Sequence, residues 1–584
     1  MIMRGSEPAA AWDGAAPFVV AISGHRDLHP DDLAGAGERL FEALELVADS
    51  LPHSALDFLS PLADGADQLF AAQVLRLRAA SATPARIRLL VPLPMPLDDY
   101  YAAQGGPDCA AFTARIAPFL QAADGVFTIA PIELDAASGA ALTAANAPYA
   151  RLARYLAIHA QLMIVVWDGQ AAAAAAPGGT LDLVRSLVDG FERCHHARSA
   201  GRLAQPEFGR VLHVQARRAQ QLPAATPALR VLSGEGGSAR DCILAAGADL
   251  DDLNRRHRAA LAADAAGYGA RVAAVRHDFL SSVGTAASAC DGALAALAHS
   301  FAVADVQAEL AKRSWRLSWR AIAIAAVLAA GSSLLRLLDM EHGDLIETLS
   351  YGIGAAAAIG IYLWVGRTGG RNAYLAYRAL AEGLRVQMYW LAAGSTALVS
   401  DDYLVKQRDD AGWVRDTLDA LTLTPAAAPL APAQVARGWI DAQLAYLAGP
   451  NIARRRLQQA RAAAWGRNLL VGGMVCAVAG VAIVVQGTFQ HTAVLVLLIV
   501  GMKLLTDLGA AWLSYDGKMA HAETLRQAAH LQAVYRRADR ALQAIERDGG
   551  AAGDLLAALG KEVLDENGNW LRVYLERRIH WHGK

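Results

Sequence analysis

The chain has 584 residues, of which 54% are hydrophobic and only 19% are charged, a balance outside the usual range of soluble proteins. Its 54 Lys and Arg residues against 56 Asp and Glu residues give a net charge of −2, which excludes the basic footprint of a nucleic-acid-binding protein. We therefore expect part of the chain to lie in a lipid bilayer and no direct contact with nucleic acid.

Residues 1–16 predict a disordered tail, because Glu7 and Asp13 interrupt the apolar core that a signal peptide needs. The five cysteines are scattered without a C-x-x-C pair, which excludes a disulfide framework and a clustered zinc site and favours a cytoplasmic soluble portion. They are Cys109, Cys194, Cys242, Cys290 and Cys476. The histidines show no metal-ligand spacing either, so we expect neither a metal nor a resident cofactor.

Short β-rich runs alternate with helical segments from Phe18 onward. Continuous apolar runs of this length suit strands buried on both faces of a parallel sheet. We predict an open, doubly wound, Rossmann-like α/β sheet over about residues 17–235, within a domain of residues 17–250. The runs are FVVAI, LDFLSPL, RIRLLVPL, GVFTIA, LMIVVW and RVLHVQA.

Three loops follow strands, at the sheet edge where such domains bind ligands. The first, Ser23-Gly24-His25-Arg26, offers a glycine for close approach of the backbone, a hydroxyl and amides for an anion, and an arginine for phosphate. A tight turn with an exposed arginine explains it equally well.

The second loop is Ala63-Asp64-Gly65-Ala66-Asp67. Either Asp64 or Asp67 binds ribose hydroxyls, or one of them caps the helix that begins QLFAAQVLRL.

The third loop begins Trp167-Asp168-Gly169 and continues through an alanine-rich stretch to Pro177-Gly178-Gly179-Thr180, directly before a helix. Two glycines at a helix N-terminus expose amides to a phosphate, and Thr180 adds a hydroxyl. A flexible loop is the alternative. The helix before LMIVVW carries polar residues that either flank the same cleft or, in the case of the two arginines, face solvent. These residues are Asn146, Tyr149, Arg151 and Arg154.

Together, SGHR, ADGAD and VVWDG followed by GGT resemble the SLOG family, Rossmann-like domains similar to the lysine-decarboxylase-like nucleotide-processing enzymes, to DprA and to the cytoplasmic module of TRPM channels. The resemblance implies binding of a nucleotide or nucleotide-derived signal. Catalytic relatives carry PGG-x-GT and then a glutamate, whereas this chain reads PGGTLDL. Asp182 either substitutes for that glutamate or caps the helix, and we favour a sensor with no assigned catalytic residue.

After a helical connector at 251–316, four apolar stretches are long enough to cross a bilayer. They predict an all-α membrane domain of two repeated hairpins, in units 317–450 and 451–584. The stretches are about 317–338, Thr348–Val365, Asn468–Gln486 and Thr492–Trp512. Basic residues cluster before the first and third stretches and after the second, while the first hairpin tip is acidic and the second carries no full charge, which places both termini in the cytoplasm. We expect a multi-pass protein of the bacterial inner membrane.

A short repeat supports two units, since Leu380-Ala-Glu-Gly-Leu-Arg385 follows the first hairpin and His521-Ala-Glu-Thr-Leu-Arg526 follows the second. Trp439 and Trp570 recur in the same order. This half resembles the SLATT group of two-transmembrane effectors that accompany SLOG sensors in bacterial conflict systems, here in tandem.

Lys503 and Asp507 lie one turn apart within the last predicted span. Either they pair with each other near the cytoplasmic boundary, or copies from several subunits line a pore.

The sequence thus predicts a homo-oligomeric membrane effector whose SLOG domain binds a nucleotide-derived messenger, such as an ADP-ribose derivative or a cyclic oligonucleotide. Binding would trigger pore formation or membrane disruption in antiphage abortive infection. The alternative is a membrane-anchored enzyme that hydrolyses N-glycosidic or phosphate bonds of nucleotides.

Overall fold

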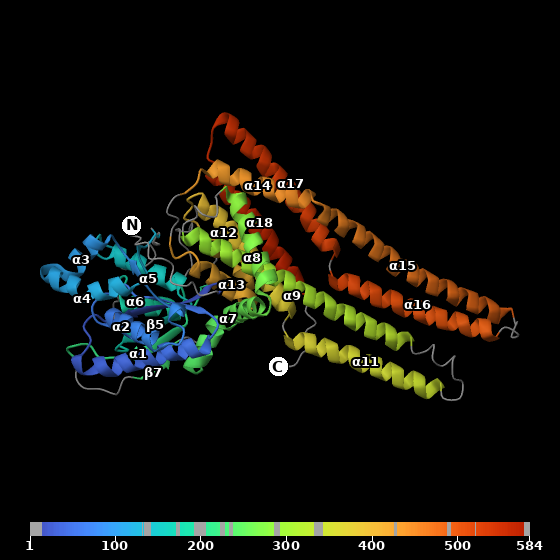
Figure 1. Ribbon diagram of the computed structural model, residues 1–584, viewed down its shortest axis with the longest axis horizontal. Coiled ribbons are helices and arrows are strands. Elements are labelled where there is room, and N and C mark those ends of the chain that lie inside the picture. Colours follow the sequence, from blue (N-terminus) through green and yellow to red (C-terminus); the bar gives the residue numbers. More distant parts are fainter. Residues whose placement is uncertain are drawn as a thin grey trace. The chain divides into compact units, whose positions relative to one another are not determined.

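The computed structural model (Figure 1) describes residues 14–130, 132, 142–170, 176–191, 206–221, 228–232, 237–284, 292–331, 343–368, 370–424, 429–486, 492–519 and 521–576. The chain forms two compact units. Unit 1 comprises Met1–Val306 and Ala379–Val435, and unit 2 comprises Gln307–Arg378 and Ala436–Lys584. The predicted tail lies outside the described residues except at its end, where Ala15 and Ala16 are buried and donate their N–H groups to Asn254 Oδ1.

Unit 1 is built on a seven-stranded sheet in the order β4-β3-β2-β1-β5-β6-β7. The first six strands are parallel, and β7 pairs antiparallel with β6. The predicted α/β domain with a mostly parallel sheet is therefore confirmed, and β7 is a strand that the sequence did not predict. The strands are β1 Pro17–Gly24, β2 Ala55–Leu59, β3 Ile87–Leu93, β4 Gly125–Thr128, β5 Leu162–Trp167, β6 Val211–Gln215 and β7 Leu229–Val231.

Helices cover both faces of the sheet because successive strand residues point to opposite sides. Phe18, Val20 and Ile22 of β1 pack under α1 (Pro30–Ser50), α2 (Ala66–Ala80), α4 (Cys109–Ala122) and α7 (Ala239–Ala263). Val19 and Ala21 pack under α5 (Ala147–His159) and α6 (Thr180–Asp189). Each face therefore has its own apolar core, as a doubly wound domain requires.

The order of the strands reverses at β1. The chain passes from β1 outward to β2, β3 and β4 on one side, and later adds β5 and β6 on the other. The connections after β1 and β5 leave toward opposite faces of the sheet, so they open a crevice between their carboxyl ends. Doubly wound proteins bind ligands at this kind of switch point.

Unit 1 also contains α8 (Ala265–Val283) and a segment, residues 379–435, that lies between the two predicted hairpins in sequence. Ala420 and Leu423, at and just after the end of α13 (Arg408–Ala420), are buried in the same apolar core as α5 and α6. The sequence analysis placed this segment with the first hairpin, whereas its buried apolar side chains complete the α/β domain.

The described elements of unit 2 are all helices. Two of its helical stretches are long and apolar enough to cross a membrane, one in the helical run Pro432–Val485 and one at Ala493–Ser514. The first hairpin contributes a shorter apolar helix, Thr348–Ile361, and α9 (Gly292–Gly331) ends before residues 332–342, which lie outside the described residues. The longer elements are α11 Gly343–Thr368, α15 Pro450–Val485, α16 Thr492–Met519, α17 His521–Asp548 and α18 Ala552–Glu576.

The two long apolar stretches do not resemble the core helices of a soluble protein. In α15 and α16, which lie side by side (Figure 1), Met474, Val485 and Leu497 are 66%, 79% and 69% exposed. Contiguous apolar surface of this kind is unfavourable in water and favourable in lipid. Both stretches are therefore long, apolar and exposed enough to be candidate membrane spans.

Each copy of the sequence repeat contains the same Glu–Arg ion pair in the structure. Glu382 and Arg385 of α12 (Gly370–Ala392) lie 2.8 Å apart, and Glu523 and Arg526 of α17 lie 3.1 Å apart, each pair separated by one helical turn. The tryptophan of each repeat unit packs against a tyrosine of the other unit. Trp439 of α14 (Pro432–Ala448) packs against Tyr535 of α17 at 6.3 Å. Trp570 of α18 packs against Tyr374 of α12 at 6.0 Å between ring centroids.

Candidate functional site

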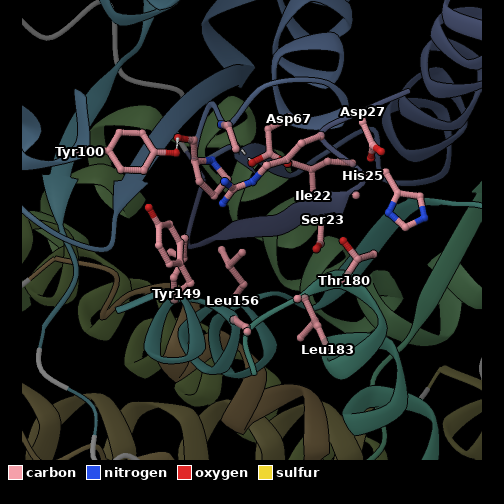
Figure 2. Close-up of a pocket in the computed structure, with 18 of the residues that line it drawn as sticks. Ile22, Ser23, His25, Asp27, Asp67, Tyr100, Tyr149, Leu156, Thr180 and Leu183 are labelled. Carbon is pink, nitrogen blue, oxygen red and sulfur yellow. Dashed lines mark hydrogen bonds between the residues drawn. The ribbon is translucent and has the colours of Figure 1, made fainter. Parts of the chain in front are cut away.

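A pocket of about 260 Å³ lies at the switch point, between the carboxyl ends of β1 and β5 (Figure 2). Most of the residues that the sequence singled out line it: Ser23, Gly24, His25, Arg26, Asp67, Gly178, Gly179 and Thr180. The rest of its wall is Ile22, Asp27, Pro61, Ala63, Tyr100, Tyr149, Leu152, Ala153, Leu156, Leu183 and Arg218. Asp64, Gly65, Asp168 and Gly169 are not among the lining residues.

The end of β1 is fixed by close backbone packing. A Cβ atom on Gly24 would lie 2.3 Å from Ala66 Cβ and 2.7 Å from Val166 O, so only glycine lets β1, β5 and the start of α2 approach this closely. The N–H of His25 continues the ladder to Val166 O at 3.0 Å. Ser23 and Arg26 therefore enter the pocket from a backbone that is held on both sides.

His25 joins the loop after β1 to the loop after β5. Its Nε2 lies 3.3 Å from Asp168 Oδ1, an ion-pair distance without hydrogen-bond geometry. Asp168 also accepts hydrogen bonds from the N–H of Gln170 and from Gln221 Nε2. Burial acts to raise the pKa of Asp168, but these hydrogen bonds and the nearby His25 outweigh it and lower that pKa. Asp168 therefore supports the pocket wall as a carboxylate behind His25.

The two aspartates of the second loop separate. Asp64 lies outside the pocket, 3.0 Å from Arg115 in an ion pair. Asp67 lines the pocket, is 7% exposed, and accepts one long hydrogen bond, 3.3 Å, from the N–H of Ala63. Burial raises its pKa to about 7, although Ala63 and the nearby Arg26 act in the opposite direction. Neither aspartate is the N-cap of α2, because that position is Gly65, which has a φ of +80°.

The N-terminus of α6 forms the opposite wall. Gly178 has a φ of +74°, and a Cβ atom there would lie 2.4 Å from Ala150 N, so the turn packs directly on α5. The N–H of Gly178 donates to Asp182 Oδ2, and that of Gly179 to Ala176 O. The first N–H groups of a helix have no partner inside it. Of the residues at the start of α6, Thr180 lines the pocket, and no acceptor in the described part of the chain takes its N–H, so this N–H and the helix dipole can bind an anion.

Asp182 is accordingly part of the turn. Its carboxylate holds Gly178 at 2.9 Å, and the residue is not among those that line the pocket. The contact is with the residue before the N-cap Gly179, so this carboxylate holds the turn that leads into the helix.

The cationic part of the pocket is Arg26. Its guanidinium lies 5.3 Å from the ring centroid of Tyr149 and makes no ion pair with any described residue. Arg218, the other lining arginine, is paired with Asp27 at 3.0 Å. In Figure 2 the hydroxyls of Ser23 and Thr180 point toward the same part of the pocket, away from the Tyr100 ring.

Sequence reasoning missed Tyr100, Asp27 and Arg218, and placed Tyr149 only on a helix near the cleft. Tyr100 comes from α3 (Leu97–Gly105), is 1% exposed, and donates its hydroxyl to Pro61 O at 2.9 Å. Nothing in the local sequence marks it. Arg218 follows β6, so only the adjacency of β5 and β6 could have indicated it.

No group of three or more potential metal ligands occurs among the described residues. No protein-family model, curated protein or solved structure matches the chain.

Proposed function

We propose that unit 1 binds a phosphate-bearing, ribose-containing small molecule in this pocket. The observation that carries the proposal is the convergence, at the switch point, of the N-terminal end of α6, the hydroxyls of Ser23 and Thr180, and Arg26. All of these groups donate hydrogen bonds or carry positive charge, as recognition of a phosphate requires. Asp67, buried and weakly hydrogen-bonded, is the acceptor that a ribose hydroxyl needs.

The size of the pocket narrows the choice of ligand. A volume of about 260 Å³ is close to the lower end of the roughly 300–1,000 Å³ typical of small-molecule sites. One nucleotide unit fits this space better than a whole cyclic oligonucleotide. A nucleotide-derived messenger such as an ADP-ribose derivative would place one phosphoribosyl end inside, and a cyclic oligonucleotide would insert a single unit.

We further propose that the helices of unit 2 act on the bilayer in response. In this proposal the exposed apolar surfaces of α15 and α16, the second hairpin, face lipid, and α9 and α11 form the first hairpin. All four spans lie in a bacterial inner membrane with both termini cytoplasmic. Homo-oligomers open a pore or disrupt the membrane, as the SLOG and SLATT resemblance suggests for antiphage abortive infection. Lys503 and Asp507, both exposed on α16, are the candidate pore residues.

The test uses the full chain, because residues 379–435 are part of unit 1 and a fragment ending at residue 250 would lack them. Thermal stability in lipid nanodiscs is measured with AMP, ADP-ribose and cyclic dinucleotides. A rise that Arg26→Ala removes supports the proposal. Unchanged stability with every compound contradicts nucleotide binding. Ligand-dependent leakage from liposomes tests the membrane step separately, and Lys503→Leu should alter leakage without changing ligand affinity.

A second function, hydrolysis of a nucleotide, is favoured by one observation. His25 lines the pocket with the Asp168 carboxylate 3.3 Å from its Nε2, and a carboxylate at this distance stabilises the protonated form that a histidine takes when it acts as a general base. Turnover of the bound nucleotide that His25→Gln abolishes without weakening binding would establish the enzyme.

A further inference from the structure

The helix that forms one wall of the pocket also holds the segment between the two hairpins. On α5, Tyr149, Leu152, Ala153 and Leu156 line the pocket. Tyr155 and His159, one turn apart on the same helix, contact residues 419–423 instead. α5 therefore lies between the candidate ligand and a part of the chain that sequence alone assigned to the first hairpin.

These contacts are specific and buried. The hydroxyl of Tyr155, 1% exposed, donates to Leu423 O at 2.6 Å. His159, 2% exposed, has its Nδ1 2.7 Å from Asp419 O. Because a carbonyl oxygen can only accept, Nδ1 of His159 carries the proton. The two rings are in contact at 4.2 Å between centroids and tilted by 38°, so a shift of α5 would disturb both hydrogen bonds together.

The segment is itself held as a unit. Arg415, 1% exposed, donates to Ser400 O at 2.9 and 2.7 Å and forms an ion pair with Glu207. Ser400 in turn donates its hydroxyl to the Asp419 carboxylate. A displacement of residues 419–423 would therefore extend through Ser400 and Arg415 to the rest of the segment.

Both ends of the segment continue within helices. Residue 379 lies inside α12 and residue 435 inside α14, and each helix runs on into residues of unit 2. A movement of the segment would act on the chain that leads out of the first hairpin and on the chain that leads into the second.

From these contacts we propose that occupation of the pocket regulates the hairpins by shifting α5 against residues 419–423, with Tyr155 and His159 as positioning residues. The inference rests on the proposed function for its purpose, since it supplies the connection from ligand to membrane. Its physical content, coupling between the pocket face of α5 and residues 399–423, can be measured without any ligand.

The experiment fills the pocket from α5 by substitution in the full chain in nanodiscs. Ala153→Leu adds volume on the pocket face, and Arg151→Leu, on the exposed side of the same helix, is the matched control. Amide hydrogen exchange is followed in peptides covering 399–423. We expect Ala153→Leu to change exchange there by about threefold or more, the control to leave it unchanged, and Tyr155→Phe to remove most of the response.

Unaltered exchange in Ala153→Leu, or an equal change in Arg151→Leu, would overturn the coupling. If Ala153→Leu does not fold, the smaller Ala153→Val carries the same comparison. Failure of every nucleotide to bind would contradict the proposed function and leave this result standing. Normal nucleotide binding without any exchange response in Ala153→Leu would contradict the coupling and leave the proposed function intact.

Discussion

The carboxylate of Asp182 accepts a hydrogen bond from the backbone N–H of Gly178 over 2.9 Å. This bond closes the turn that leads into α6, and Gly178, Gly179 and Thr180 of this turn line the pocket. The turn depends on glycine, since Gly178 has a φ of +74° and touches the backbone of α5.

Gly178→Ala should lower the free energy of unfolding by about 2–4 kcal/mol. The alanine would be forced into a left-handed backbone conformation, and its methyl group would lie 2.4 Å from Ala150 N. The matched control is Gly106→Ala, where φ is +50° but nothing lies within 4 Å, and about 1 kcal/mol of backbone strain is expected. Thermal unfolding of the full chain compares the two. Equal losses of stability would show that the packing against α5 is not tight.

Arg26→Ala should weaken nucleotide binding by about 10- to 100-fold, the loss expected for one charge-assisted hydrogen bond of about 1.5–3 kcal/mol. Arg115→Ala is the control, because Arg115 pairs with Asp64 outside the pocket. Isothermal titration measures both affinities. Similar weakening in the two variants would indicate a general electrostatic effect in place of a contact with the ligand.

Asp67→Asn should stabilise the protein at pH 8 and change little near pH 4. The pKa of Asp67 is about 7 in the folded protein against 3.8 for the free side chain, so between these values the folded state retains a proton that the unfolded chain releases. Stability therefore falls as pH rises from about 4 to 7, by at most about 4 kcal/mol.

Thermal unfolding at pH 4.5 and pH 8 measures this effect, with Asp64→Asn, an exposed carboxylate, as the control. A gain in the Asp67→Asn variant that is the same at both pH values would contradict the raised pKa.

Cys476 should be protected from a charged maleimide in intact and permeabilised membranes, and should react after denaturation in SDS, because it lies in the middle of the apolar part of α15. The variant used carries serine at the other four cysteines. A second variant carries serine at all five native cysteines and Ile353→Cys as its one cysteine. Its reaction with the maleimide tests α11 in the same way. Reaction of that residue in intact membranes would leave only the second hairpin as membrane-spanning.

The sequence located the pocket because its loops follow strands, and parallel strands bring their carboxyl ends to one edge. Ser23, Asp67 and Thr180 could be predicted from that rule alone. Tyr100 and Arg218 could not be predicted, because their positions in the pocket wall depend on how α3 packs and on β6 lying beside β5. Gly65 was read as a ligand-binding residue, yet a Cβ there would lie 2.4 Å from Arg26 O, so packing accounts for it.

The same limit applies to larger elements. Residues 379–435 follow an apolar hairpin, and their sequence carries no sign that Ala420 and Leu423 complete the core under α5. β7 has three residues and no extended apolar run, so periodicity could not reveal it. The α15 and α16 stretches were predictable because a long apolar run can be seen directly in the sequence.

The crossed tryptophans of the tandem repeat bear on how the protein evolves. Trp439 of the first copy packs on Tyr535 of the second, and Trp570 of the second packs on Tyr374 of the first, so each copy is a partner of the other within one chain. In an assembly of identical single-hairpin subunits, every mutation appears in all positions at once. Here the two copies lie in one chain and can mutate independently, so a substitution in either copy changes only one side of each aromatic contact.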